Sequence, residues 1–250
     1  MAENKTVTAA VIIIGNEVLS GRTRDANLQY LGENLNAIGV RLLEVRVIPD
    51  VEDVIVSAVN QLRAEFDYVF TTGGIGPTHD DITAACIAKA FGVDVILDPE
   101  AERLVRSNYA TPEDVTPARL KMAHVPAGSA LLANPVSKSP GFRVENVYVL
   151  PGVPRIMQAI FESFRHELAG GEPVISREIN AFLPEGTLGG PLSDIQDRFP
   201  DADVGSYPFV RNGRFGAALV VRHPDQAVVD AAATEICAMI RDLGAEPMED

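Results

Sequence analysis

The sequence predicts an α/β protein: a three-layer α/β/α domain with a mostly parallel sheet, followed by a small α+β domain. Two observations lead to this prediction. Short continuous runs of β-branched residues, typical of strands buried on both faces, alternate with amphipathic helical segments up to about residue 168. A Gly-Gly-Glu-Pro stretch at residues 170–173 then interrupts this alternation and is the best linker candidate in the chain.

The first strands are expected at residues 9–14 (AAVIII), 40–48 and 68–71 (YVFT). Residues 26–38 and 51–66 lie between them and carry apolar residues at spacings of three and four, which indicates helices. Strands connected by single helices run parallel in one sheet. We therefore expect these three strands to be parallel neighbours, none of them at a solvent-facing edge.

The remaining elements of the first domain follow from the same signals. Asp25 can cap the first helix and Gly39 can end it. Further helices are expected at residues 83–91, 99–109, 117–123 and 155–168, and further strands at residues 93–97, 142–144 and 148–150, the last two as a hairpin.

The domain boundary is expected at the Gly-Gly-Glu-Pro stretch, which gives domains at residues 1–170 and 171–250. The second domain has the predicted order β-α-β-β-α, typical of a small α+β sandwich. Its expected elements are a strand at residues 174–183, a short helix at 191–198, strands at 204–209 and 215–221 around an Asn-Gly turn, and a helix at 226–243.

Composition limits the function and the location of the protein. The chain has 250 residues with 21 Lys and Arg against 35 Asp and Glu, a net charge of −14, which argues against a nucleic-acid-binding surface. A small anionic ligand stays possible, because one local site can differ from the average field. No apolar run approaches the ~20 residues of a membrane span, and the amino terminus does not resemble a signal peptide. Cys86 and Cys237 are expected to be reduced, so we expect a cytoplasmic protein that contacts no membrane.

The segment after residues 68–71, TTGGIGPTHDD, is the most informative in the chain. Ligands of open α/β sheets bind beyond the carboxyl ends of the strands. Here Gly73, Gly74 and Gly76 lack Cβ atoms, so backbone N–H groups can approach an anion beside a helix N-terminus. Thr72 and Thr78 add hydroxyl groups to this expected phosphate or nucleotide site.

Carboxylates at the same sheet edge complicate a simple phosphate site. Asp80 and Asp81 end the glycine loop, Glu17 follows the first strand, and Asp50 follows the second. A carboxylate repels a phosphate unless a divalent cation bridges them or the carboxylate acts as a general base. In the alternative interpretation, Asp80 or Asp81 and Asp50 are helix caps and Glu17 is a solvated loop residue. Lys138 either neutralises a phosphate or is a solvated lysine.

Four segments in the right order resemble the MoaB/Mog family, the molybdopterin-binding fold of molybdenum-cofactor biosynthesis. They are TTGGIGPTHDDIT, residues 12–31 (IIIGNEVLSGRTRDANLQYL), 134–142 (NPVSKSPGF) and 150–157 (LPGVPRIM). The Gly-Pro-Thr-x-Asp-Asp form of the loop is similar to the amino-terminal domain of CinA and to the related domain of eukaryotic FAD synthases. The resemblance covers about residues 8–168. The carboxyl-terminal amidase domain of CinA, which deamidates nicotinamide mononucleotide, is expected to be absent.

The resemblance implies a three-layer α/β/α fold and a homo-oligomer, often a trimer. It ties Asp81 and Asp50 to catalysis. Mog-type proteins adenylylate the molybdopterin phosphate, whereas CinA-like domains are linked to metal-dependent hydrolysis of nucleotide pyrophosphates such as ADP-ribose or FAD. Asp80 favours the second chemistry, since Mog-type loops tend to have a basic residue there.

The leading hypothesis is therefore a divalent-metal-dependent nucleotide pyrophosphatase that uses Mg, Mn or Co. In this hypothesis Asp81, Asp80 and Asp50 are catalytic, and Asp80, Asp81 and Glu17 hold the metal. Gly73, Gly74, Gly76, Thr72, Thr78 and Lys138 would bind the phosphate or nucleotide. A molybdopterin-binding or adenylylating protein is the alternative, and a non-catalytic nucleotide- or pterin-binding module is the third hypothesis. In each case the partner is an anionic small molecule, either a dinucleotide or molybdopterin.

Overall fold

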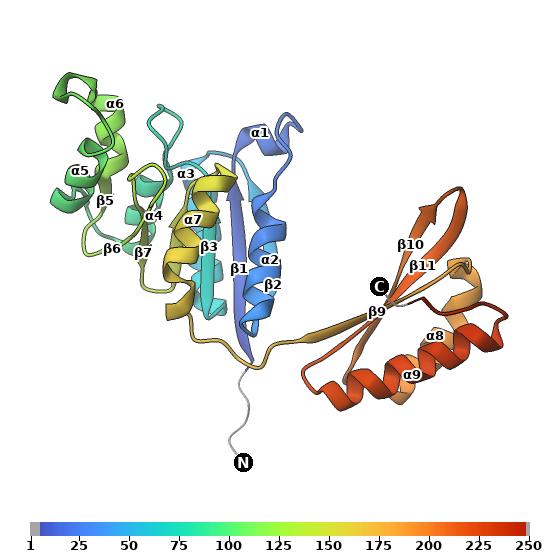
Figure 1. Cartoon of the computed structure of the whole chain (residues 1–250). Helices are drawn as coiled ribbons and strands as arrows, with labels where there is room; N and C mark the ends of the chain where they lie inside the picture. Colours follow the sequence, from blue (N-terminus) through green and yellow to red (C-terminus); the bar gives the residue numbers. More distant parts are fainter. Residues whose placement is uncertain (1–5, 249–250) are drawn as a thin grey trace, which may run out of the picture. The chain divides into compact units, whose positions relative to one another are not determined.

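A computed structural model describes residues 6–248 of the chain (Figure 1). The chain divides into two compact units, with the boundary between Gly171 and Glu172, and each unit is described separately below. Within the described residues, no helix has the length and apolar character that crossing a membrane requires.

Six strands form the main sheet of the first unit, in the order β2-β1-β3-β8-β7-β6. They are β1 (Val7–Ile14), β2 (Val40–Ile48), β3 (Tyr68–Thr72), β6 (Ala130–Leu132), β7 (Gly141–Val144) and β8 (Val147–Leu150). The first four strands of that order run parallel, and β7 and β6 are each antiparallel to their neighbours. The mostly parallel sheet and the β7–β8 hairpin agree with the sequence prediction.

β1 lies between β2 and β3 and pairs in parallel with both, so the three strands are neighbours as predicted. The prediction that none of them lies at an edge is wrong, because β2 ends the sheet. The sequence of β2 explains this position. Arg41, Glu44 and Arg46 interrupt its apolar residues, whereas the last six residues of β1 are apolar and buried. Alternation of this kind is typical of a strand that is only partly covered.

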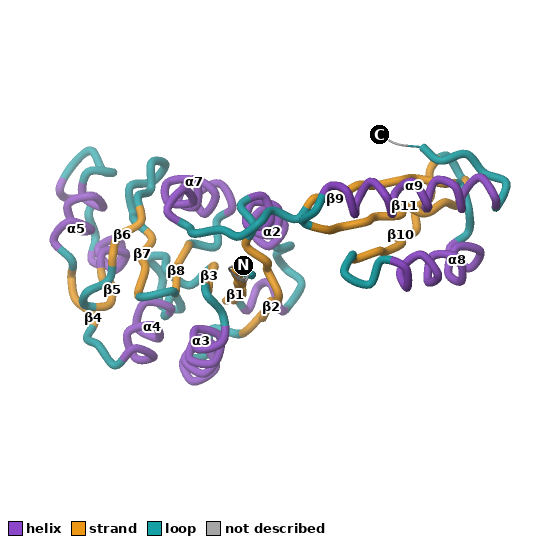
Figure 2. Tube along the Cα trace, turned by 90° about the horizontal axis from the view of Figure 1, so that it is seen from below, coloured by secondary structure: helices purple, strands orange, loops and turns teal. Residues whose placement is uncertain are grey.

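Helices cover both faces of the sheet, which Figure 2 shows edge-on. α2 (Asn27–Ala37) and α7 (Pro154–Phe164) lie on one face, and α3 (Glu52–Glu65) and α4 (Thr83–Phe91) on the other. Alternate residues of β1 pack into the two resulting apolar clusters, Ile12 with α3 and α4, and Ile13 with α2 and α7. Asp25 caps α2 as predicted, since its Oδ2 accepts the N–H of Leu28 at 2.8 Å.

Several smaller elements complete the first unit. The short α1 (Asn16–Leu19), β5 (His124–Pro126) and β6 were not predicted. β4 (Val95–Leu97) pairs with β5 in a separate two-stranded sheet, so the strand expected at residues 93–97 does not belong to the main sheet. α5 (Pro99–Arg106) and α6 (Pro117–Leu120) lie between β4 and β5 in the sequence, and short 3-10 turns occur at residues 112–114, 121–123 and 165–167.

The second unit has the predicted order β-α-β-β-α, with an antiparallel sheet ordered β10-β11-β9. Its elements are β9 (Ile175–Ala181), α8 (Glu185–Arg198), β10 (Asp203–Arg211), β11 (Arg214–His223) and α9 (Gln226–Asp242). Asn212 and Gly213 make the turn between β10 and β11, both with positive φ, as the Asn-Gly pair predicts. α8 begins six residues before the predicted 191, and Pro191 lies inside it. Leu188 and Leu192 bury against the sheet, and this packing outweighs the cost of an interior proline.

Candidate functional site

The glycine loop is fixed where it leaves β3. The N–H of Gly73 donates to the carbonyl of Leu150 at 3.0 Å, so it supports the loop instead of facing a ligand. Gly73 has a φ of 104°, and a Cβ there would lie 2.1 Å from the carbonyl oxygen of Ile14, so only glycine fits. The carbonyl of Gly74 accepts the N–H of Thr83 at 2.9 Å, which ties the loop to the start of α4.

At the far end of the loop, Asp80 and Asp81 converge on Thr78. Oδ2 of Asp81 accepts the Thr78 N–H at 2.7 Å, and the Thr78 hydroxyl lies 2.5 Å from Oδ1 of Asp80 and 2.5 Å from Oδ2 of Asp81. One hydroxyl has one proton, so it can donate to only one of the two carboxylates at a time. The hydrogen bond from Thr78 is the main reason that the pKa of Asp80 lies below its ordinary value, so this exposed carboxylate stays charged.

Neither aspartate caps α4. The helix begins at Thr83 after Ile82, and no side chain accepts a hydrogen bond from its first turn. The carboxylate of Asp81 instead lies against Gly76, since a Cβ at Gly76 would be 2.7 Å from Oδ2. The helix-cap interpretation of Asp81 therefore does not describe its contacts. Because the Thr83 N–H donates to the Gly74 carbonyl, the N–H groups at this helix start that a ligand could engage are those of Ala84 and Ala85.

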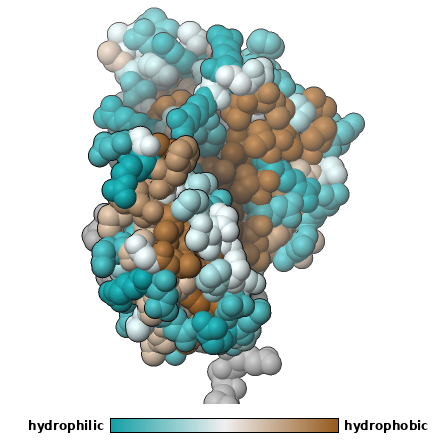
Figure 3. Space-filling model, turned by 90° about the vertical axis from the view of Figure 1, so that its right-hand side faces the viewer, coloured by the Kyte–Doolittle hydropathy of each residue, from teal (hydrophilic) through white to brown (hydrophobic). Residues whose placement is uncertain are grey.

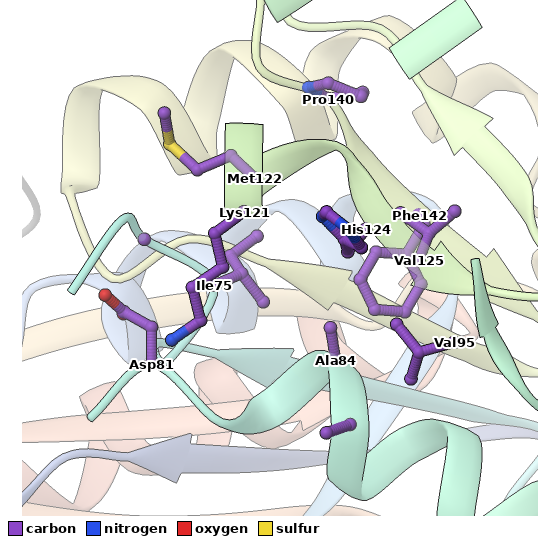
Figure 4. A pocket seen from close by; sticks show the side chains of 12 residues that line it. Ile75, Asp81, Ala84, Val95, Lys121, Met122, His124, Val125, Pro140 and Phe142 are labelled. Atoms are coloured by element: carbon purple, nitrogen blue, oxygen red, sulfur yellow. The ribbon is translucent and has the colours of Figure 1, made fainter. Parts of the chain in front are cut away.

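A cavity of about 90 Å³ lies next to this helix start (Figure 4). Ile75, Gly76 and Asp81 line it from the loop, and Ala84 and Ala85 from the first turn of α4. Lys121, Met122, His124, Val125, Val95, Pro140 and Phe142 complete its lining. Figure 4 shows a polar end, where Lys121 extends toward Asp81, and an apolar end with Phe142 and Val95. The Lys121 ammonium also donates to the Thr78 carbonyl, and this hydrogen bond holds the lysine side chain at the loop.

The two other predicted carboxylates, Glu17 and Asp50, follow the ends of β1 and β2. Oδ2 of Asp50 accepts the N–H of Asn16 at 2.8 Å, and the Gly15 N–H donates to the Ile48 carbonyl at 3.1 Å, so the ends of β1 and β2 are joined. Glu17 folds back over Gly15 and lines a second, smaller cavity that also contains Thr72. The structure thus brings Asp80, Asp81 and Thr78 together, and places Glu17 and Thr72 at a separate cavity.

No sequence signal selects Lys121 or His124, which line the first cavity. They lie 40 and 43 residues after Asp81, the last residue of the glycine loop, just before and at the start of β5. Lys138, which was selected, lies in the exposed turn before Pro140 with a φ of 62°, and it does not line the cavity.

A divalent cation fits one mode of binding here. Among residues 6–248, no group of three His, Cys, Asp or Glu side chains is arranged to hold a metal ion. Mg²⁺, however, is commonly bound by one or two carboxylates together with substrate phosphates and water. Asp80, Asp81 and the Thr78 hydroxyl offer oxygen atoms of this kind, so the residues suit a cation that arrives with an anionic ligand.

The fold and the loop define a three-layer α/β protein with a glycine loop at the carboxyl edge of a mostly parallel sheet. Residues 10–170 match the family model described as a probable molybdopterin binding domain, and residues 173–248 match the middle domain of FAD synthase. The chain therefore belongs to the MoaB/Mog-type molybdopterin-binding domain family, followed by a region of the FAD synthase middle-domain type.

Several known proteins are similar to this chain. A CinA protein of unknown function from Thermoplasma acidophilum has a solved structure with 35% identity and a TM-score of 0.61, covering 65% of this chain and 99% of its own. A protein of Pyrobaculum calidifontis is 37% identical over 211 residues, 80% of each chain. A probable FAD synthase of Caenorhabditis elegans is 31% identical over 257 residues, which cover 92% of this chain but only 49% of that protein.

Proposed function

We propose that this protein is a divalent-metal-dependent nucleotide pyrophosphatase acting on a dinucleotide such as ADP-ribose or FAD. The observation that carries the proposal is the convergence of Asp80, Asp81 and the Thr78 hydroxyl in the loop that leads into the N-terminus of α4. This arrangement supplies oxygen ligands for a cation and N–H donors for a phosphate within one loop. The FAD synthase name of a similar protein and the match to the FAD synthase middle domain support a nucleotide-related activity.

The phosphate-binding side of the site is the start of α4 with Lys121. N–H groups of Ala84 and Ala85 at a helix N-terminus attract an anion, and Lys121 adds a full positive charge at the polar end of the cavity. The apolar end, with Phe142 and Val95, offers a surface for a ring. The cavity therefore suits a phosphate attached to a partly apolar group.

Asp80 and Asp81 would hold the divalent ion, which when bound lowers the pKa of water and neutralises phosphate charge. In the chain itself, a carboxylate of this pair accepts a proton from the water that attacks one phosphorus, and Lys121 orients the phosphate. The bond from that phosphorus to the bridging oxygen breaks, and the other phosphate leaves with that oxygen. Asp50 keeps the first loop beside the site through its bond to the Asn16 N–H. These roles require both carboxylates to be ionised, which the lowered pKa of Asp80 favours.

The test is a hydrolysis screen of ADP-ribose, FAD, NAD and ATP with Mg²⁺, Mn²⁺ and Co²⁺. We expect turnover of a dinucleotide that depends on added metal. Lys121→Met should raise KM strongly, whereas Lys138→Met should have little effect. Lys89→Met serves as a control, because Lys89 lies in the last turn of α4 and pairs with Glu52 of α3. Absence of turnover with every substrate and metal would reject the proposal.

A molybdopterin-binding or adenylylating protein is the second candidate, which the description of the matching family favours. The same cavity and helix N-terminus would then hold a pterin phosphate. Tight pterin binding without dinucleotide cleavage would select this candidate. A module that binds a dinucleotide without cleaving it would show affinity for ADP-ribose and no turnover with any metal.

We also propose that the protein forms a homo-oligomer through the edge strand β2. Leu43, Val45 and Val47 are exposed on this strand, with 61%, 37% and 40% of their surface accessible. Charges such as Arg41, Glu44 and Arg46 are usual on an edge strand that faces water, but three exposed apolar side chains on the same strand are not. Figure 3 shows one face of the molecule, on which apolar residues form continuous areas between hydrophilic ones. On β2 the exposed apolar side chains are Leu43, Val45 and Val47, and a group of this kind is typical of an interaction surface.

The sequence of β2 is complementary to itself in one antiparallel register. With Val45 opposite Val45 of a second copy, Leu43 faces Val47 and Glu44 faces Arg46. Apolar pairs then share one face of the extended sheet and ion pairs the other, and both kinds of cross-strand pair are stabilising. The register therefore predicts a two-fold dimer.

Charge exchange tests this register. Glu44→Arg or Arg46→Glu alone should give the 26.8 kDa mass of one chain by light scattering, because like charges then face each other. The double exchange should restore twice that mass. Arg41→Glu is the matched control, since Arg41 faces the uncharged Pro49 in this register. A trimer mass, or single variants that remain dimers, would refute pairing through β2.

A further inference from the structure

The second cavity lies at the carboxyl ends of β1 and β3, on the face of the sheet covered by α2 and α7. It has a volume of about 60 Å³. Thr72 and Asn27 line it, and Glu17, Arg24, Asp25 and Gly152 are among the residues around them. Both Thr72 and Asn27 are almost completely buried, at 1% and 3% exposure. No sequence signal other than its place after Asp25 distinguishes Asn27.

Two buried oxygen atoms in this cavity have no hydrogen-bond partner, Oγ1 of Thr72 and Oδ1 of Asn27. The orientation of Asn27 is set by its amide nitrogen, which donates to the Gly152 carbonyl at 2.9 Å. Its Oδ1 is therefore left as an acceptor that needs a donor. Buried polar atoms in folded proteins nearly always have a partner, so two such atoms in one cavity indicate a missing group.

The polar side chains that line the cavity indicate which kind of ligand group it can bind. Asn27 Oδ1, Asp25 and Glu17 are acceptors, and the two carboxylates outweigh the single positive charge of Arg24, so the lining disfavours a phosphate. A hydroxyl group suits the site, because it donates to Asn27 Oδ1 and accepts from Thr72. The volume is about that of two water molecules, which accommodates one edge of a sugar but not a whole nucleotide.

We propose that this cavity is a subsite for a hydroxyl group on the sugar of the bound nucleotide, held by Asn27 and Thr72. The inference rests on the proposed function and extends it from the phosphate to the sugar. The two cavities adjoin the same loop, since Thr72 lines this one and Ile75 and Gly76 line the other. The proposal requires a nucleotide whose phosphate lies by α4 to extend around the glycine loop to α2, on the other face of the sheet.

The experiment compares binding of AMP with that of its 2′-deoxy and 3′-deoxy forms by calorimetry, on the full chain. Wild type should bind AMP more tightly than at least one deoxy form, by roughly two- to tenfold, the value of one hydrogen bond between neutral groups. Thr72→Val keeps the shape of the side chain and removes the hydroxyl. This variant should weaken AMP binding by a similar factor and bind AMP and the deoxy form almost equally. Because the comparison is a ratio within one variant, partial unfolding does not change it.

Thr71→Val is the matched control. Thr71 is the preceding residue of β3, its Oγ1 is also buried without a partner, and it pairs with Ile12, which packs on the opposite face of the sheet. This variant should keep the preference for AMP. If wild type binds AMP and both deoxy forms equally, the subsite is wrong and the cavity holds only water, while the proposed function still stands. If wild type binds neither AMP nor ADP-ribose, both proposals fail.

Discussion

Replacement of Asp81 by asparagine separates a catalytic role from a structural one. In the wild type, Oδ2 of Asp81 accepts the Thr78 N–H at 2.7 Å. Asp81→Asn retains the size of the side chain and an oxygen that can accept this N–H. The hydrogen bond changes from a charged to a neutral acceptor, which costs about 1 kcal/mol. A change of that size lowers Tm by roughly 2–4 °C in a protein of this length. Loss of a group that holds a metal or accepts a proton costs about 10²–10⁴-fold in rate.

The assay is metal-dependent turnover of the best substrate, measured together with thermal unfolding. Asp98→Asn is the matched control, because Asp98 caps α5 by accepting the N–H groups of Glu100 and Ala101 at 2.9 Å each. It should show a comparable small loss of stability and normal turnover. If Asp81→Asn also retains most of its turnover, Asp81 only holds the loop, and the metal site proposed here does not exist.

Three further predictions concern stability. Gly73→Ala should lower the free energy of unfolding by about 2 kcal/mol or more in urea, since it adds a backbone clash to an unfavourable φ; Gly128→Ala, with a φ of 80° and open space around it, should cost clearly less. Limited proteolysis should cut first between Gly171 and Ile175, leaving a folded first unit, and an insoluble first fragment would contradict this. Burial and then the hydrogen bond to Glu162 raise the pKa of Tyr30 to about 12, so its contribution to stability should persist below the ordinary tyrosine pKa and disappear as pH rises through about 12. Tyr30→Phe should remove that alkaline dependence, as followed by denaturant unfolding.

Local patterns predicted most of the fold. Residues 9–14 form part of a strand that is buried on both faces, as predicted. α2 begins two residues after Asp25 and ends two residues before Gly39. The charged residues of β2 agree with its edge position, although the prediction overlooked them. The separate pairing of β4 with β5 depends on which strands meet, and neighbouring residues do not encode this. α8 shows the same limit, because burial of Leu192 outweighed the usual effect of Pro191.

The residues of the candidate site were also only partly predictable from the sequence. Thr78, Asp80 and Asp81 lie within four residues, so their meeting follows from the loop itself. Lys121 donates to the carbonyl of Thr78 from 43 positions along the chain, a contact that exists only once the β4–β5 substructure is in place. Sequence reasoning therefore found the acidic half of the site and selected Lys138 in place of the lysine that lines the cavity.

The attachment of the glycine loop has a consequence for binding kinetics. Gly73 is held by Leu150 and by close contact with Ile14, and Gly74 is held by Thr83. A segment already fixed in this way has little conformational entropy left to lose when a ligand arrives. We therefore expect association without a slow closing step, with any adjustment confined to the exposed tip around Thr78.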